Sequence, residues 1–251
     1  MSEQALLAVD GSVATLSLNR PDQHNALSVE LLEGLHECVD ELEARDDVSV
    51  LVITGEGRSF CAGMDLKAVV KVEGEDWPGP RLLESLGRLT VRLRGLAMVT
   101  VAKVNGAAIG GGCGLSCVAD ISISHADARL GFPEVDLGIC PAVVAPWVVR
   151  KIGMGRARVV LLSGGLMSGV GAHEMGLVDH LADERDGLDG LTSLVVERLA
   201  SGGHRAMRAT RGLLNELDGS LDEAVILEGA KLSASVLGTA EAQASLRARM
   251  K

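Results

Sequence analysis

The hydrophobic and polar positions of the chain follow two periods, one typical of strands and one typical of helices. Residues 5–10 and 13–19 are apolar or alternating runs on either side of Gly11-Ser12, which predicts a β-hairpin. Over residues 29–44 apolar side chains recur at helical spacing, after a serine that can cap the helix. The same patterns predict buried strands at 48–54 and 99–104, shorter strands at 121–124 and 128–132, and helices at 81–96, 112–118, 143–152, 155–162 and 168–175.

The last quarter of the chain has a different pattern. From about residue 188 to 249 the apolar positions fall into three or four helical segments without a strand signal. Strands followed by helices over the first part indicate an α/β core. We therefore expect an α/β protein, with the core in residues 1–190 and a helical C-terminal subdomain in residues 191–251.

Composition narrows the possible functions. A chain of 251 residues with 47% hydrophobic residues can bury a sizeable core. A net charge of -10 and 2% aromatic residues argue against a nucleic-acid or anionic-membrane partner. The five cysteines are odd in number and form no C-x-x-C pair, which argues against a disulfide framework. With no signal-peptide pattern at residues 1–4 and no bilayer-length apolar run, we expect a cytoplasmic protein.

Two glycine-bearing segments carry the candidate chemistry. They are residues 59–66 (SFCAGMDL) and 105–115 (NGAAIGGGCGL), and each joins a strand-like run to a helix-like run. Such a turn exposes backbone N–H groups that no helical carbonyl has claimed, with the positive end of the helix dipole behind them. Two such turns brought together could donate two hydrogen bonds to one oxygen, which is the requirement for an oxyanion hole.

At these segments the chain resembles the crotonase superfamily, also called the enoyl-CoA hydratase/isomerase family. One glycine-rich turn is a weak signal, whereas five motifs in the order and spacing of the family are a strong one. Asp120 also fits the pattern, and we expect it to make structural hydrogen bonds. The motifs are residues 18–21 (LNRP) with 25–27 (NAL), 60–66 (FCAGMDL), 105–112 (NGAAIGGG), 132–134 (FPE) with 137–138 (LG), and 172–178 (AHEMGLV).

The resemblance implies a spiral of ββα units whose helical C-terminal region forms a homotrimer or a dimer of trimers. It also implies an acyl-CoA thioester as substrate, so coenzyme A is part of the substrate and neither a separate cofactor nor a metal is expected. The backbone N–H groups of Met64 and Gly111 would hold the thioester oxygen. The stretch 69–86 would shape the acyl pocket. The residues expected to contact the substrate are His24, Ala26, Ala62, Gly63, Asp65, Leu66 and Gly110.

The resemblance assigns the acid–base chemistry to Glu134. Hydratases of the family usually carry a further glutamate just after the triple-glycine stretch, where this chain has Gly114. A single carboxylate is enough to move a proton between carbons, as in the isomerases of the family. Residues 134–144 (EVDLGICPAVV) nevertheless resemble glutaconyl-type hydratases, some of which also have glycine at that position. We expect addition of water to, or its removal from, an acyl-CoA; the alternatives are an isomerase and a catalytically silent CoA-binding homologue.

Other side chains support weaker hypotheses. Asp136 lies two residues after Glu134 and should point elsewhere, and the apolar neighbours of the cysteines favour inert thiols. Ala142 stands where dienoyl-CoA isomerases of the family have an aspartate, which argues against that reaction. A nucleotide site at the triple glycine would lack both the G-x-G-x-x-G spacing and the lysine of a P-loop.

Overall fold

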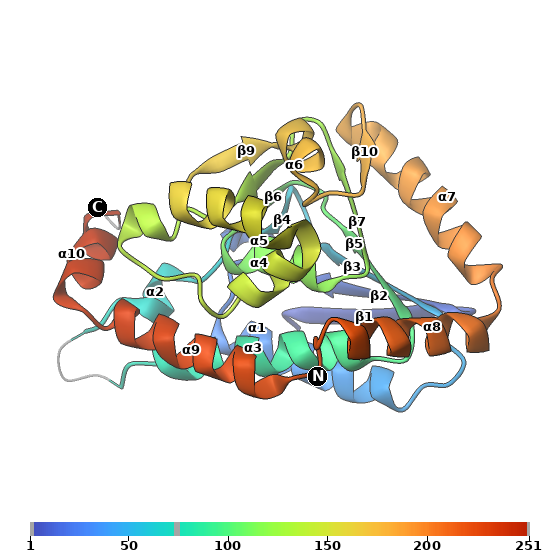
Figure 1. The fold of residues 1–251 in the computed structure, drawn as a ribbon, viewed down its shortest axis with the longest axis horizontal. Helices are drawn as coiled ribbons and strands as arrows, with labels where there is room; N and C mark the ends of the chain where they lie inside the picture. The colour runs from blue at the N-terminus through green and yellow to red at the C-terminus, as the bar shows by residue number, and fades with distance from the viewer. Residues whose placement is uncertain (1–2, 73–75, 250–251) are drawn as a thin grey trace.

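A six-stranded sheet and a four-stranded sheet form the centre of the molecule (Figure 1). The computed structural model describes residues 3–72 and 76–249, so part of the stretch 69–86 lies outside the described residues. In the larger sheet β1 and β2 pair antiparallel, as the predicted hairpin, and the other neighbours are parallel. In spatial order its strands are β1 (Ala5–Asp10), β2 (Val13–Leu18), β3 (Val50–Gly55), β5 (Val99–Lys103), β7 (Ile121–His125) and β10 (His180–Ala182).

Successive strands of the core alternate between the two sheets. The chain passes from β3 to β4, from β5 to β6 and from β7 to β8, and each pair leads to helices, which is the predicted spiral of ββα units. The sequence pattern predicted β8 but missed β4, β6, β9 and β10, because a strand of three residues shows at most one alternation. The smaller sheet consists, in spatial order, of β4 (Ser59–Cys61), β6 (Ala107–Ile109), β8 (Arg129–Gly131) and β9 (Leu166–Ser168).

Two buried asparagines hold the crossing from β3 to β4. The Asn105 side chain donates to the Gly55 carbonyl at 2.8 Å and accepts from the Gly55 amide at 3.3 Å. The Asn25 side chain donates to the carbonyls of Glu56, at 3.0 Å, and Ser59, at 2.8 Å. Because β4 then pairs with β6 in parallel, the two glycine-bearing segments that contain these strands leave the smaller sheet side by side.

The helices of the core largely follow the predicted pattern. The Ser28 hydroxyl accepts from the Leu31 amide at 3.2 Å and caps the first helix as expected. The two helices predicted over 143–162 form one element, interrupted at Gly153, where φ is 78°. The helices are α1 (Val29–Glu43), α2 (Leu66–Val69), α3 (Gly79–Gly95), α4 (Gly111–Val118), α5 (Ala145–Ser163) and α6 (Gly169–Met175).

Within the described residues four helices follow β10, in agreement with the predicted three or four. Leu188 of the first packs with Val101 and Ile123 of the larger sheet. The third lies along α3 (Figure 1), and its Ile226 belongs to the main hydrophobic core. In the described part of the chain no helix has the length and apolar character needed to cross a membrane. The four are α7 (Leu188–Ala200), α8 (His204–Leu217), α9 (Glu223–Leu237) and α10 (Ala240–Arg249).

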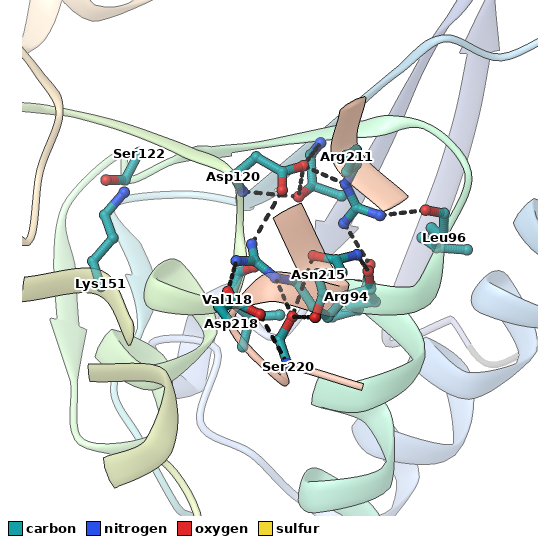
Figure 2. Close-up of polar contacts among 12 residues, drawn as sticks. Arg94, Leu96, Val118, Asp120, Ser122, Lys151, Arg211, Asn215, Asp218 and Ser220 are labelled. Carbon is teal, nitrogen blue, oxygen red and sulfur yellow. Dashed lines mark hydrogen bonds and ion pairs between the residues drawn. The ribbon is translucent and has the colours of Figure 1, made fainter. Parts of the chain in front are cut away.

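A buried polar network joins α8 to the core (Figure 2). The Asp120 carboxylate accepts from the Arg211 guanidinium at 2.6 Å, from Arg94 at 3.1 Å and from the Thr100 amide at 2.7 Å. The Asn215 side chain, one turn after Arg211, donates to the Arg94 carbonyl at 2.9 Å. Asp120 therefore has the structural hydrogen-bonding role predicted for it, and it ties the middle of α8 to α3 and β5.

Candidate active site

A cavity of about 230 Å³ lies where β4 and β6 give way to α2 and α4. Both glycine-bearing segments line it, together with the loop after β8 and the last helix, α10. Among the described residues that line it, the charged side chains are Glu134 and Arg249, and most of the others are apolar. The lining residues are Ala62, Gly63, Met64, Leu66, Val69, Ile109, Gly110, Gly111, Pro133, Glu134, Leu137, Ile139, Leu246 and Arg249.

The backbone amide of Met64 points away from Leu27, the residue with which Met64 forms a parallel β-bridge. The Leu27 amide donates to the Gly63 carbonyl at 2.7 Å, and the Asp65 amide donates to the Leu27 carbonyl at 2.9 Å. In such a parallel bridge the residue between these two groups turns its own N–H to the opposite side. Met64 is also among the residues that line the cavity.

The amide of Gly111 belongs to the first residue of α4, so no carbonyl of that helix can accept from it. The preceding Gly110 has φ 54°, a conformation that favours glycine, and its amide donates to the Gly131 carbonyl at 2.8 Å. The Gly63 turn packs against this helix start, since a Cβ on Gly63 would lie 4.0 Å from the Gly111 nitrogen. Met64 and Gly111 thus line one cavity from adjoining turns.

Glu134 turns its carboxyl group toward the same glycine turn. A Cβ on Gly110 would lie 2.6 Å from Oε1, and Oε2 has no hydrogen-bond partner among the described residues. Only 7% of the residue is exposed. Burial raises the pKa of Glu134 to about 7, opposed by a hydrogen bond from its own backbone amide. A carboxyl with this pKa can both accept and donate a proton near neutral pH.

Some of the predicted substrate-contact residues line the cavity, and others do not. Ala62, Gly63, Leu66 and Gly110 line the cavity beside the residues just described. His24, Ala26 and Asp65 are not among its lining residues. His24 is exposed, with Nδ1 3.1 Å from the Ser59 hydroxyl, and the Ala26 carbonyl accepts from the Arg20 guanidinium. Asp65 caps α2 and forms an ion pair with Arg20 at 3.0 Å.

Asp136 and the cysteines lie as the sequence predicts. The Asp136 carboxylate accepts from the Gly165 amide at 2.8 Å and does not line the cavity. Burial raises the pKa of Cys61 to about 12. A hydrogen bond with Cys117, together with burial, raises the pKa of Cys113. Thiols of this kind stay protonated near neutral pH and are poor nucleophiles.

Sequence reasoning missed the contribution of α10. Leu246 is fully buried and, with Arg249, closes the cavity from the far end of the chain. The spacing of Ala242 and Leu246 indicates an apolar helix face, which was a usable signal for burial. That face could not reveal its partner, because the contact depends on how α9 and α10 fold back over the core.

Comparison with known proteins identifies the family. The family model described as enoyl-CoA hydratase/isomerase matches residues 8–248. The chain belongs to the enoyl-CoA hydratase/isomerase family, within the crotonase superfamily. The ββα spiral with its helical tail is accordingly a crotonase fold.

Individual members of the family agree with this assignment. A candidate enoyl-CoA hydratase of Thermus thermophilus is 36% identical over 212 residues, covering 83% of each chain. The crystal structure of an enoyl-CoA hydratase/isomerase from Marinobacter aquaeolei has a TM-score of 0.78 at 30% identity, over 99% of this chain and 97% of that one. One from Mycobacterium paratuberculosis has a TM-score of 0.88 at 24% identity over 99% of both chains, a likeness of fold.

Proposed function

We propose that the protein is an enzyme that acts on an acyl-CoA thioester. It either adds water across a carbon–carbon double bond or removes water to form one. The observation that carries the proposal is the meeting of three groups at one cavity: the amides of Met64 and Gly111, and the buried carboxyl of Glu134. Two amides on one carbonyl oxygen would stabilise the negative charge of an enolate. The apolar lining would strengthen those hydrogen bonds by excluding water.

Hydration would use Glu134 twice. Its carboxylate takes a proton from water while the water oxygen bonds to the β-carbon of the enoyl group. The electron pair of the double bond moves onto the thioester oxygen, where the two amides hold it. The carboxyl then returns the proton to the α-carbon as the carbonyl re-forms. The raised pKa suits both steps, because neither protonation state is strongly preferred near neutral pH.

A specific packing contact supports isomerisation as a second candidate. A Cβ on Gly114 would lie 2.3 Å from Val144 Cγ1, so an apolar side chain occupies the space that an acid at position 114 would need. With one carboxyl, Glu134 can remove a proton from the α-carbon of a 3-enoyl thioester and return it to the γ-carbon. The dienolate between the two steps would again place its charge on the oxygen held by the amides.

Product analysis across 2-enoyl, 3-enoyl and glutaconyl-type CoA esters separates the candidates. Hydration yields a product heavier by one water, whereas isomerisation shifts the double bond at constant mass. The same assays with Glu134→Gln measure the turnover that does not depend on this carboxyl group. Binding without turnover of any ester would indicate a catalytically silent CoA-binding homologue, and absence of binding would contradict the proposal altogether.

We propose further that the protein assembles as a homotrimer or a dimer of trimers. The support comes from α8, whose polarity is reversed relative to an ordinary surface helix. Arg211 and Asn215 are buried against the core, whereas Leu213, Leu214 and Leu217 are exposed. An apolar row directed outward is typical of a surface that another protein chain covers.

A further inference from the structure

A second, smaller cavity adjoins the first. Both are lined by Met64, Gly111 and Glu134. The volume of the inner cavity is about 10 Å³, which leaves room for about one water-sized group. Its other walls are formed by α3, by α9 and by the loop that precedes α5. The residues are Leu83, Leu86, Cys140, Pro141, Val143, Val144 and Ser233.

The two cavities differ in size, at about 230 Å³ for the outer one and about 10 Å³ for the inner one. The outer one also extends to the exposed Arg249. A thioester carbonyl held by the two amides has two substituents that point in different directions. Coenzyme A is too large to be enclosed, so the sulfur side must leave through the outer cavity. The acyl side then runs into the inner cavity.

Val144 closes the inner cavity on the side of α4. Its Cγ1 would lie 2.3 Å from a Cβ on Gly114, far inside van der Waals contact, so this glycine is what allows the valine to sit there. From α9, the Ser233 hydroxyl donates to the Cys140 carbonyl at 2.7 Å and accepts from the Val143 amide at 3.3 Å. These two hydrogen bonds fix the loop that carries Val144.

We propose that Val144, seated on Gly114, is the end wall of the acyl pocket and limits the acyl group to about four carbons. The proposal rests on the function proposed above. The carbonyl carbon lies at the amides, the next two carbons lie beside Glu134, and the inner cavity has room for one terminal methyl group. A smaller side chain at this wall should enlarge the cavity and lengthen the acyl chain that the protein accepts.

Binding of saturated acyl-CoA thioesters, from butyryl to decanoyl, tests the wall by isothermal titration calorimetry. Saturated esters cannot be hydrated or isomerised, so the readout does not depend on turnover. For the unmodified protein, affinity should stop rising beyond butyryl-CoA. Val144→Ala should tighten hexanoyl-CoA binding about tenfold, since each methylene buried in apolar surroundings raises the binding affinity about fourfold. Val148→Ala, the same change at a buried α5 position outside both cavities, should keep the original profile.

Leu86→Ala enlarges the same cavity from α3 and serves as the second variant if Val144→Ala does not fold. It too should tighten hexanoyl-CoA binding relative to butyryl-CoA. The proposal is overturned if the affinity of the unmodified protein rises steadily up to decanoyl-CoA. It is also overturned if a folded variant with the enlarged cavity keeps the original chain-length profile. Failure to bind any acyl-CoA is a different result, because it contradicts the proposed function itself.

Discussion

At the scale of single residues, the carboxyl of Glu134 depends most on its surroundings. An acid after a proline in a loop would ordinarily be solvated, with a pKa near 4.5. Here the side chain lies against Gly110 in an apolar cavity, and burial raises the pKa of Glu134 to about 7. The ionisation of this group should therefore affect both catalysis and stability near neutral pH.

Turnover should rise with pH and level off above an apparent pKa near 7, because hydration begins with the ionised carboxylate. Glu134→Gln should lower kcat by about 10²–10⁴, the usual contribution of general acid–base catalysis. Steady-state rates from about pH 5 to about pH 9 on a responsive acyl-CoA measure both effects. Full turnover by Glu134→Gln on every ester would refute the assignment of the base.

The unfolding free energy should depend on pH through the same group. Below pH 4.5 the carboxyl is protonated in both states; between 4.5 and about 7 the unfolded chain releases the proton while the folded protein retains it. Stability from this group therefore falls as pH rises through that window, by about 3 kcal/mol in all. Glu134→Gln cannot titrate, so its stability relative to the unmodified protein should increase over the window in urea unfolding. Parallel pH curves for the two proteins would contradict this.

Gly111→Val should abolish most of the turnover. A Cβ on Gly111 would lie 3.1 Å from Leu27 Cδ1 and 3.3 Å from Leu86 Cδ2, so a branched side chain must displace the start of α4 and its amide. Loss of one oxyanion-hole donor lowers kcat by about 10²–10³. Gly155→Val is the control, because a Cβ on Gly155 has no neighbour within 4 Å. Equal rates for the two variants would show that the Gly111 amide is not used.

At the scale of secondary-structure elements, α8 is held by ionic and polar contacts. The Arg211 side chain is 6% exposed and donates to Asp120 and to the carbonyls of Leu93 and Leu96. Through these contacts, α8 is joined to the end of α3 and to the start of β7 (Figure 2). The next helix, α9, packs mainly against α3 and carries Ser233 to the inner cavity.

Arg211→Ala should lower the free energy of unfolding by about 3 kcal/mol, since it leaves buried acceptors without their donor. Arg208→Ala on the same helix removes an ion pair whose arginine side chain is 53% exposed, and it should change stability by less than about 1 kcal/mol. Urea unfolding of the two variants measures the difference. Similar losses in both would show that the network contributes no more than a surface pair.

The length of an element decided how well the sequence predicted it. The helix at α1 and the strands β3 and β5 were predicted because each repeats its pattern over several residues. The strands β4 and β6 carry too little periodicity to be read, although they bring the two glycine turns together. The glycine motifs therefore indicated the site, whereas the sheet that pairs them became visible only in the structure.

At the scale of the whole molecule, the outward apolar row on α8 indicates where another copy would pack. Leu217 is 75% exposed, although it lies on a helix whose inward residues are Arg211 and Asn215. A helix with this reversed polarity is best explained by an interface. The proposed assembly can therefore be tested by changing this row alone.

Light scattering should give three or six times the 26.1 kDa mass of one chain. Replacing both Leu213 and Leu217 by glutamate should shift the mass toward that of a single chain, because two charges would be desolvated in an apolar interface. Arg208→Ala, which alters the same helix without touching its apolar row, should retain the native mass. An unchanged mass for the glutamate variant would place the interface elsewhere.

The sequence by itself determined the α/β pattern, the family motifs, the pair of glycine turns and the single acid in the PE segment, because these depend on residue type and short-range spacing. The tertiary structure decided which of these groups meet. The pairing of β4 with β6 brings the two glycine turns to one cavity, and burial raises the pKa of Glu134. The seating of Val144 on Gly114 and the return of α10 over the cavity join residues far apart in the chain. Such contacts depend on how whole elements pack, which no local pattern encodes.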